Sequence, residues 1–441
     1  ICHRGGLKVV SARPTAHSGT FRALRHRNYR IWFFGQGISL IGTWMQTMAQ
    51  QLLVYRLTGS AAALGMINFM GLIPLLPLAL WGGSLSDRIP KRTVILGTQT
   101  GMLLQALLLA GLTLSGAIQV WQVYALALVM GALQAVDLPA RQSFTVDMVE
   151  GKEDLTNAIG LNSALFNAAR ALGPALSGVV VAATGEGLAF LINALTFVAV
   201  IVSLLLMRNL PRSSAPATVG LARHMAEGIG YVAGQRALLV LMSMVAVSAF
   251  LSMPYSTLMP VFADDVLHES ASAAVRALCY GPLPLLRCQT PEALPLGMLL
   301  TMVGLGALAG ALVIASLPEG VRRGRILTVG NLIFPASLIV FSQSRSFWLS
   351  LACLGLVGFS FVAQNALANT LIQVHTPDTM RGRVMSLYSL VMQSAMRLGG
   401  LQAGLVADRI GAALAVGLGA GFSLAYGAFV ALRFPRVRQL Q

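Results

Sequence analysis

The segment Gly83-Ser-Leu-Ser-Asp-Arg-Ile-Pro-Lys-Arg92 places one acidic and three basic side chains in a short loop. The stretch that leads into this loop, 61–84, and the stretch that follows it, 93–115, are strongly apolar. Each is long enough to cross the hydrocarbon core of a bilayer as a helix, which takes about 20 residues. A charged loop between two such stretches is typical of two membrane-spanning helices joined at the membrane surface.

The composition of the whole chain agrees with this interpretation. Of the 441 residues, 56% are hydrophobic and 10% are charged, whereas about a quarter of the residues in a soluble domain are charged. The net charge of +16 on a soluble protein would suggest nucleic acid as a partner. Here the basic residues fall between the apolar stretches, so we expect a lipid bilayer around the protein and no nucleic acid.

Twelve apolar stretches of suitable length can be marked along the chain. They predict an all-α membrane protein with twelve transmembrane helices. The predicted spans are 31–54, 61–84, 93–115, 120–140, 158–183, 188–207, 238–262, 294–317, 326–342, 347–370, 384–407 and 412–432.

Basic residues are concentrated in alternate loops. The segments 22–30, 88–92, 141–152, 208–236, 322–325, 381–383 and 433–438 hold most of them. The intervening loops hold only Arg56, Arg276, Arg287, Arg345 and Arg409. Because positively charged loops stay in the cytoplasm, this asymmetry places both termini there.

A repeat divides the chain into two halves of six spans. Gly173-Pro-Ala-Leu-Ser-Gly178 in the first half resembles Gly399-Gly-Leu-Gln-Ala-Gly404 in the second, and the charged loop at 87–95 resembles 319–327. Such a repeat predicts two six-helix bundles, 21–207 and 237–441, around a central site near the bilayer midplane.

Three segments lie outside the predicted bundles. Residues 1–20 lack the apolar core of a signal peptide, and we expect a disordered tail that could be upstream sequence translated in error. Residues 208–236 form a cytoplasmic linker whose amphipathic part, 221–232, lies on the membrane surface or extends the seventh span. Residues 268–295, with Cys279 and Cys288, are an atypical outer-loop insert. It could be a genuine insert closed by a disulfide or a frameshifted stretch, and we favour the second because the apolar pattern recovers cleanly after it.

The segment 83–92 resembles the motif G-x-L-x-D-R-x-G-R-K, which follows the second helix in transporters of the major facilitator superfamily. Pro90 stands where the motif has its second glycine, which alters the turn but keeps the charges. The resemblance implies a latch that holds the two bundles in one conformation, completed by the end of the fourth span. The expected latch residues are Gly83, Asp87, Arg88, Lys91, Arg92, Asp137 and Arg141. The alternative is that these charges only set the topology.

The fifth predicted span carries Gly173, Pro174 and Gly178, which resemble the helix 5 motif of exporters and antiporters in the same superfamily. Proline removes one backbone hydrogen bond and glycine admits a neighbouring helix, so we expect a bend there. Together with 21–30, 137–142 and 381–386, the pattern is similar to the bacterial subfamily of the enterobactin exporter and the macrolide efflux proteins. The resemblance runs from about residue 21 to residue 433 and fails at 268–295.

This resemblance implies the major facilitator fold and a secondary active transporter in the bacterial inner (plasma) membrane. Proton influx would drive efflux of a siderophore or an amphiphilic drug by alternating access. The alternative is an importer, or a carrier of another metabolite. A membrane-embedded enzyme is less favoured, because no cluster of His, Asp or Cys lies in the spans. We expect no cofactor and no metal, a small-molecule substrate, the proton as coupling ion, and a monomer.

Two arginines fall in the middle of predicted spans, where a charge is costly and usually functional. Arg170 and Arg397 would suit an anionic or catecholate-like substrate; alternatively, each snorkels or pairs with a carbonyl. No carboxylate falls in the middle of a span, so Asp137 is the best candidate to carry a coupling proton. Most amides in the spans should join helices to one another. The amides that we expect to line the cavity are Gln46, Gln50, Asn167 and Gln393.

Overall fold

The computed structural model describes residues 21–75, 77–78, 89–208, 221–280, 288–318 and 320–440. Throughout these ranges the secondary structure is helical, with no strand. The predicted tail at 1–20 lies outside the described residues, as do 209–220 of the linker and 281–287 of the insert.

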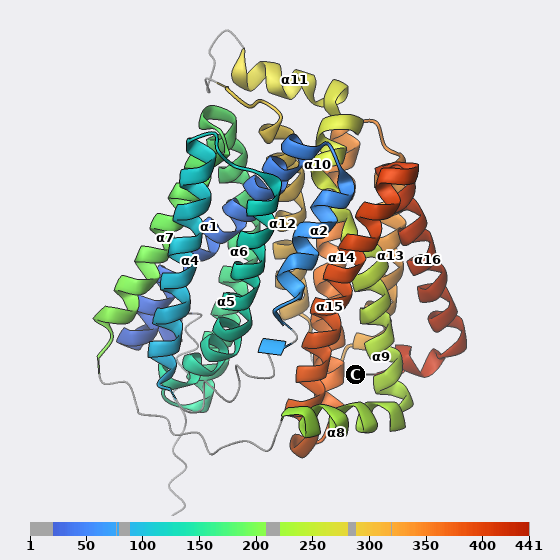
Figure 1. The fold of residues 1–441 in the computed structure, drawn as a ribbon. Helices are drawn as coiled ribbons and strands as arrows, with labels where there is room; N and C mark the ends of the chain where they lie inside the picture. The colour runs from blue at the N-terminus through green and yellow to red at the C-terminus, as the bar shows by residue number, and fades with distance from the viewer. Residues whose placement is uncertain are drawn as a thin grey trace, which may run out of the picture.

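The first half of the chain forms one bundle, whose helices other than α2 lie on the left of Figure 1. Its helices are α1 (Arg27–Thr58), α2 (Ala61–Leu72), α4 (Lys91–Leu114), α5 (Val120–Asp147), α6 (Lys152–Thr184) and α7 (Glu186–Leu206), preceded by the short helix η1 (Arg22–Arg25). Within it, α7 packs against α1 and α4, α6 packs against α1, and α5 packs against α2 and α4.

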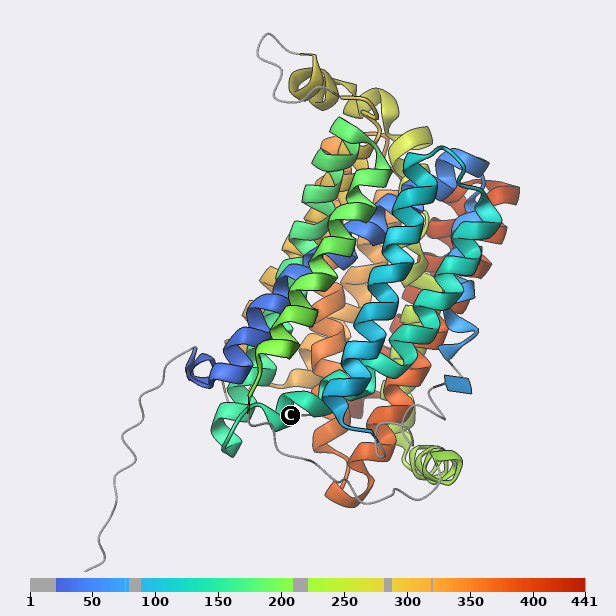
Figure 2. The ribbon, with the colours of Figure 1, turned by 60° about the vertical axis from the view of Figure 1, so that its left-hand side comes forward.

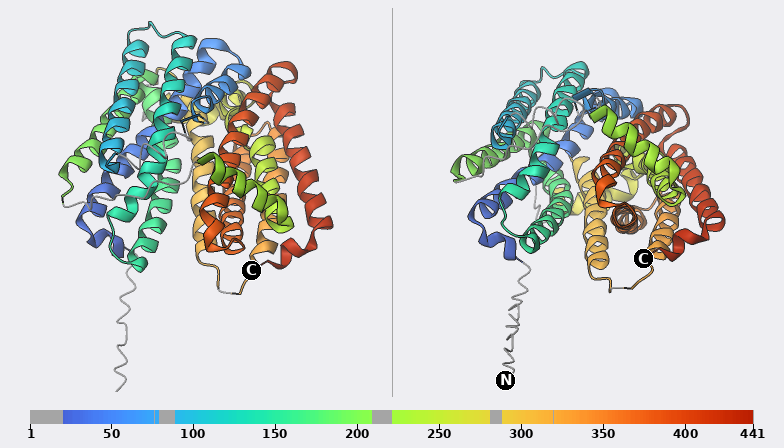
Figure 3. Two further views of the ribbon diagram at one scale, coloured as in Figure 1. Left: turned by 60° about the horizontal axis from the view of Figure 1, so that its bottom comes forward. Right: turned by 90° about the horizontal axis from the view of Figure 1, so that it is seen from below.

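The second half forms the other bundle, and the view from below in Figure 3 separates the two groups of helices. One long helical segment comprises α9 (Arg236–Val247), η2 (Ser248–Ser252), η3 (Met253–Ser256), α10 (Met259–Val261) and η4 (Phe262–Val266). The other helices of this bundle are α12 (Ala293–Ala315), α13 (Arg323–Gln343), α14 (Phe347–Val374), α15 (Asp378–Ile410) and α16 (Ala412–Arg433), followed by η5 (Pro435–Gln439).

Nine helical segments of the described chain are long and apolar enough to cross a membrane. Helices α1, α2 and α15 run alongside them, so the all-α membrane fold is confirmed (Figure 1). The described part of α2 is too short to span by itself, and the number twelve therefore stays a prediction.

The two ends of the molecule carry different short helices. Helix α11 (His268–Cys279) lies at one end, here called the α11 end, and α8 (Leu221–Gly234) lies at the other, here called the α8 end (Figure 1). Figure 2 looks along the axis of α8 and shows it lying across the bundle helices. The backbone becomes extended at Gln235, so α8 is a separate surface helix and not an extension of α9.

Single glycines with positive φ make the turns at the α11 end. Gly185, at φ 80°, joins α6 to α7, and Gly411, at φ 87°, joins α15 to α16. Side chains other than glycine rarely adopt this conformation. Gly173 and Gly178 lie twelve and seven residues before the first turn; Gly399 and Gly404 lie at the same spacing before the second.

The bundles meet through two helix pairs, α6 with α12 and α2 with α15. Small residues allow both approaches: a Cβ on Gly178 would lie 3.1 Å from the Cα of Gly297, and a Cβ on Gly404 would collide with the carbonyl oxygen of Ala61. Such contacts are typical of membrane helices, where close backbone packing drives association. The contacts of Gly178 and Gly404 lie in the halves of these helices nearer the α11 end.

Helix α5 differs from the predicted fourth span. We expected the span to end at residue 140, but the helix continues to Asp147 with Pro139 inside it. Asp137 therefore lies ten residues before the end of the helix, and its side chain is buried.

The insert at 268–295 is ordered where the structure describes it. Residues 268–279 form α11, and Cys279 and Cys288 form a disulfide. The hydroxyl of Ser270 accepts a hydrogen bond from the backbone N–H of Phe347 on α14 at 3.1 Å. On the far side of the disulfide, the backbone N–H of Gln289 donates to the carbonyl oxygen of Ala182 on α6 at 2.6 Å. The disulfide is the one that a genuine insert would form.

Candidate substrate site at the bundle interface

The segment that follows α9 is the most irregular part of the bundle helices. It passes through two π-helical turns, η2 and η4, and a 3-10 turn, η3, with Pro254 and Pro260 inside it. Proline provides no backbone N–H, so a regular α-helix cannot continue there. At membrane depth, irregular backbone is tolerated where it is buried in protein or lines a cavity. This segment carries Tyr255, which is fully buried.

Arg170 lies midway along α6 and contacts aromatic rings from both bundles. Its guanidinium carbon is 5.8 Å from the ring centroid of Trp44 on α1 and 5.5 Å from that of Phe361 on α14. Cation–π contacts of this length stabilise by about 0.5–2 kcal/mol, more where water is excluded. The Phe334 ring packs on both Phe361, at 5.6 Å, and Tyr255, at 6.3 Å. Arg170 therefore sits in an aromatic box formed by both halves of the chain.

The charge of Arg170 is not compensated by an acidic side chain among the residues that the structure describes. Arg170 has no carboxylate partner in the described part of the chain. Tyr255 is only 1% exposed, and its hydroxyl lies beside the guanidinium without a hydrogen bond of standard geometry. The hydroxyl of Ser252, one turn earlier, is also buried without a partner. A buried donor without an acceptor typically costs about 1–3 kcal/mol.

The second arginine, Arg397 on α15, crosses the bundle interface. A Cβ added to Gly71 of α2 would lie 2.6 Å from the Nη1 atom of Arg397. The guanidinium thus reaches the backbone of α2, and Gly131 of α5 also packs against Gly71. Among the described residues Arg397 makes no hydrogen bond or ion pair. Both predicted mid-span arginines thus lie between the bundles without acidic partners.

A polar cluster adjoins the Phe361 ring in the second bundle. The side chain of Gln364 is 2% exposed, donates to Oδ1 of Asn331 at 2.8 Å, and accepts from Ser248 at 3.3 Å. The residues around this cluster are Val245, Ser248, Ala249, Phe361, Gln364, Asn365 and Met392, and they leave no space for a water molecule between them. Our sequence prediction did not include these residues in the site. The pair Gln364-Asn365 in the middle of an apolar stretch was the signal that could have indicated them.

The predicted cavity amides occupy different positions. Gln46 is buried inside the first bundle, where its Nε2 donates to Gln105 at 3.2 Å and its Oε1 accepts from Asn193 at 2.6 Å. Its amide therefore joins α1 to α4 and α7. Asn167 donates to the carbonyl oxygen of Ser163 on its own helix at 2.9 Å. Gln50 and Gln393 are half-buried.

The helix 5 motif shapes the wall of the aromatic box. A Cβ on Gly173 would collide with the Cβ of Trp44, so glycine brings Trp44 close to α6. Arg170, one turn earlier on α6, contacts the same indole ring. Pro174 lies inside the helix, and its carbonyl oxygen would be 3.0 Å from a Cβ on Gly297. The motif thus lies at both the Trp44 contact and the bundle interface.

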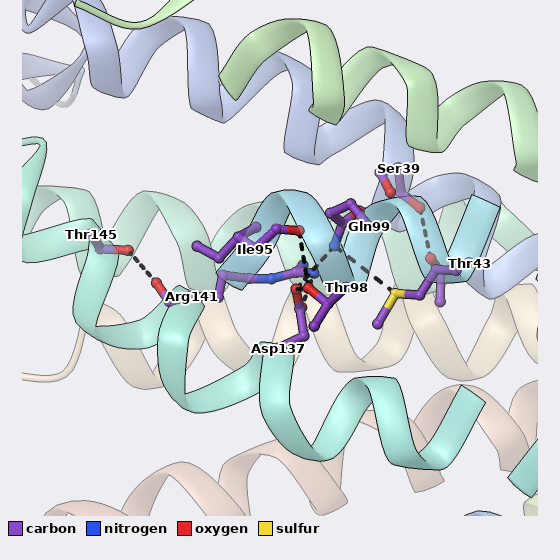
Figure 4. A network of polar contacts seen from close by, with 9 residues as sticks. Ser39, Thr43, Ile95, Thr98, Gln99, Asp137, Arg141 and Thr145 are labelled. Carbon is purple, nitrogen blue, oxygen red and sulfur yellow. Dashed lines mark hydrogen bonds and ion pairs between the residues drawn. The ribbon is translucent and has the colours of Figure 1, made fainter. Parts of the chain in front are cut away.

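Asp137 is the centre of a polar network between α4 and α5 (Figure 4). One carboxylate oxygen accepts from the hydroxyl of Thr98 at 2.7 Å and from Nε2 of Gln99 at 3.2 Å; the other pairs with Arg141. The Arg141 guanidinium also lies 6.0 Å from the ring centroid of Trp32. The Asp137 side chain is 4% exposed, so these contacts replace its water.

The other predicted latch residues that the structure describes also bind within the first bundle. The ammonium group of Lys91 pairs with Asp147 at 2.9 Å, and Arg92 donates to the carbonyl oxygen of Leu205 at 3.3 Å. Asp147 is absent from the sequence-based prediction, because α5 was expected to end before it. Gly83, Asp87 and Arg88 lie outside the described residues.

Polar contacts between the bundles gather at the α11 end. The Tyr55 hydroxyl donates to Asp265 at 2.6 Å, and Asn68 donates to the Thr257 hydroxyl at 3.1 Å. Asp408 accepts from the start of α2, at the backbone N–H of Ala61. For pairs of described residues, all hydrogen bonds between the bundles lie in this half of the molecule. In the described part of the chain, hydrogen bonds therefore join the two bundles at the α11 end.

Comparison with protein families gives one match that covers nearly the whole chain. The family described as "Transmembrane secretion effector" matches residues 18–281 and 269–441, two ranges that meet in α11. The chain is 24% identical to the staphyloferrin A transporter of Staphylococcus aureus (strain NCTC 8325 / PS 47), with 86% of this chain and 90% of that protein covered. It is 23% identical to macrolide efflux protein A of Streptococcus pyogenes, with 87% and 90% covered. It is 26% identical to the enterobactin exporter EntS of Citrobacter koseri (strain ATCC BAA-895 / CDC 4225-83 / SGSC4696), with 90% and 86% covered.

Solved structures share the fold. The nucleoside transporter NupG superposes with a TM-score of 0.67 at 13% identity, covering 93% of this chain and 99% of that one. A bacterial homologue of the human lysosomal transporter Spinster, in an inward-facing and occupied conformation, gives a TM-score of 0.65 at 12% identity, with 95% and 97% covered.

Proposed function

Because the chain belongs to the transmembrane secretion effector family of the major facilitator superfamily, and is a multi-pass membrane transporter rather than an enzyme, we propose that it exports a small molecule from the bacterial cytoplasm. The relatives named above support a siderophore or an amphiphilic drug as substrate. The observation that carries the proposal is Arg170, whose guanidinium contacts rings of both bundles.

Alternating access is the proposed mechanism. A ligand bound at Arg170 would lie between the bundles, so rocking them would alter its contacts to Trp44 and Phe361 unequally. The hydrogen bonds of Tyr55 and Asp408 hold the bundles together at the α11 end. Breaking these bonds would open a path to the site from that end, while the α8 end closes. The predicted latch at Gly83, Asp87 and Arg88 belongs to this proposal as the contact that closes the α8 end.

We place the α11 end outside the cell. Disulfides persist in oxidising compartments, and the Cys279–Cys288 disulfide lies at this end. The loops rich in arginine lie at the α8 end, which the positive-inside rule assigns to the cytoplasm. Both observations support cytoplasmic termini and a plasma membrane location.

Proton influx is the proposed driving force. Asp137 is the candidate proton carrier, because it is a carboxylate buried inside a helix. Both of its carboxylate oxygens already accept from Arg141, Thr98 or Gln99, so a proton could bind there only where one of these contacts breaks. Release of Arg141 would then be the step that links the proton to the motion of α4 and α5.

Accumulation in cells that lack their own exporters tests the function. The cells are loaded with a panel of fluorescent amphiphilic drugs or a catecholate siderophore, with and without the protein, and a protonophore is added midway. Lower accumulation that the protonophore reverses is the expected result, and Arg345→Ala in an exposed loop should behave as the wild type. Higher accumulation in cells that hold the protein would indicate import and contradict the proposal.

A further inference from the structure

The aromatic box around Arg170 has an excess of hydrogen-bond donors. The guanidinium has five N–H donors and no acceptor, and the buried Tyr255 hydroxyl is the described polar side chain that interacts with it. The nearby rings of Trp44 and Phe361 contact the guanidinium, which stays partly exposed, but they accept none of its hydrogen bonds in its plane. A ligand that completes this site must therefore supply acceptor atoms, and its charge must be negative.

We propose that Arg170 and the Tyr255 hydroxyl form a binding site for a carboxylate carried on an apolar body. This inference rests on the proposed transport function and names the chemical class of the substrate. The planar fork of a guanidinium matches the two oxygens of a carboxylate. The rings of Trp44, Phe334 and Phe361 provide the apolar surface for the rest of the molecule.

The same geometry rejects a cationic amphiphile. No carboxylate of the described chain lies beside Arg170, and the acidic residues that join the bundles, Asp265 and Asp408, lie at the α11 end. A cation in the box would meet an uncompensated guanidinium in a region of low polarity, where repulsion between like charges is strong. The site therefore selects between anionic and cationic substrates, which fold and family leave open.

Binding of three matched probes to the purified protein in lipid nanodiscs tests the proposal. 1-Naphthoate has the carboxylate and the apolar body, 1-naphthamide is its neutral counterpart, and 1-naphthylmethylamine is its cationic counterpart. Titration calorimetry should show naphthoate binding at least tenfold more tightly than either of the others. Equal binding of naphthoate and naphthamide, preferred binding of the amine, or no binding of naphthoate at millimolar concentration would overturn the proposal.

Variants assign the effect to the proposed residues. Arg170→Ala should weaken naphthoate binding at least tenfold, Arg170→Lys should weaken it less, and Tyr255→Phe should weaken it about tenfold, the lower value for a hydrogen bond to a charged group. Naphthamide binding should change less than twofold in all three. Arg345→Ala, in an exposed loop, is the matched control for loss of a positive charge. Because Arg170→Ala could fail to fold, Tyr255→Phe and Arg170→Lys are decisive: unchanged naphthoate binding in both would contradict the assignment.

The same variants separate this inference from the proposed export. If naphthoate binds in an Arg170-dependent way but cells export no tested compound, the site stands and the direction of transport is wrong. If cells export a compound equally well with Arg170→Lys and Tyr255→Phe, and the purified protein does not distinguish naphthoate from naphthamide, export stands and the anion site is wrong.

Discussion

Asp408 of α15 caps the amino terminus of α2 across the bundle interface, where one of its oxygens accepts a hydrogen bond from the backbone N–H of Ala61 at 2.7 Å. The other oxygen accepts from the hydroxyl of Ser60 at 2.7 Å, and that hydroxyl in turn accepts from the N–H of Ala63. A negative charge at the start of a helix also interacts favourably with the helix dipole. The cap of one bundle's helix is thus supplied by the other bundle.

Replacing Asp408 with alanine should weaken the junction at the α11 end. Loss of a capping side chain costs about 1 kcal/mol, which corresponds to about a fivefold larger population with the bundles apart there. Spin labels at Leu57 of α1 and Ile410 of α15, both exposed, report this separation as a longer distance between the labels. Arg409→Ala at the neighbouring exposed position should leave the distance distribution unchanged. An unchanged distribution in Asp408→Ala would show that the cap does not hold the bundles together.

Replacing Asp137 with alanine should destabilise the first bundle more than loss of an exposed acid does. The substitution leaves Arg141 without its ion pair and removes the acceptor for Thr98 and Gln99. Because Arg141 is partly exposed, we expect a loss of about 2–3 kcal/mol in the free energy of unfolding, below the value for a fully buried pair.

Thermal and denaturant unfolding in detergent measure this loss. The matched control is Asp378→Ala, which also breaks a pair with an arginine in the same helix, but whose side chain is 87% exposed. An exposed pair of this kind contributes about 0.5 kcal/mol or less. Equal effects of the two substitutions would show that the network around Asp137 contributes nothing beyond an ordinary surface pair.

Hydrophobic length made several helices predictable from the sequence. The predicted span 188–207 corresponds to α7 (Glu186–Leu206), and 294–317 corresponds to α12 (Ala293–Ala315). The thickness of the bilayer sets this length, so composition alone reveals it. The end of α5 was missed because we interpreted Asp137 as a marker of the membrane surface. Its charge is instead compensated by Arg141, Thr98 and Gln99, which only tertiary structure brings together.

The candidate site was partly predictable for a similar reason. Arg170 and Arg397 could be identified because a charged residue within an apolar stretch is recognisable from the sequence, without knowledge of the tertiary structure. Tyr255 and Phe361 could not, because an aromatic residue in an apolar stretch is ordinary. The Tyr55–Asp265 contact joins residues far apart in the sequence, and neither has an unusual local context. Such contacts depend on how the bundles are placed, which the local pattern does not encode.

Removing the disulfide should loosen the insert without unfolding the bundles. Cys279 and Cys288 are nine residues apart, and closing a loop of this size stabilises by about 2–3 kcal/mol in the chain-entropy account. In Cys279→Ser/Cys288→Ser we expect amide hydrogen exchange in α11 to accelerate about thirty- to a hundredfold. Exchange in α12 should not change. Cys353→Ala, which removes the half-buried free thiol of α14, is the control. Unchanged protection of α11 would mean that its contact with α14 through Ser270 is sufficient to hold it.

Adding one methyl group at Gly404 should separate α15 from α2, while the same change at Gly382 of the same helix should not. A Cβ on Gly404 collides with the backbone of Ala61, which cannot move aside as a side chain could, whereas a Cβ on Gly382 meets nothing within 4 Å. Overpacking of this kind costs about 1–3 kcal/mol, and alanine at an open helical position stabilises by up to about 1 kcal/mol. Gly404→Ala should therefore lower the unfolding temperature and lengthen the distance between labels at Leu57 and Ile410, and Gly382→Ala should leave that distance unchanged.

Because Gly404 and Gly178 hold equivalent places in the two halves, Gly178→Val should likewise push α6 away from α12, with Gly160→Val on the same helix as its control. If both interface variants kept wild-type distances and stability, close helix approach would not be what joins the bundles, and the polar contacts of Tyr55, Asn68 and Asp408 would have to suffice.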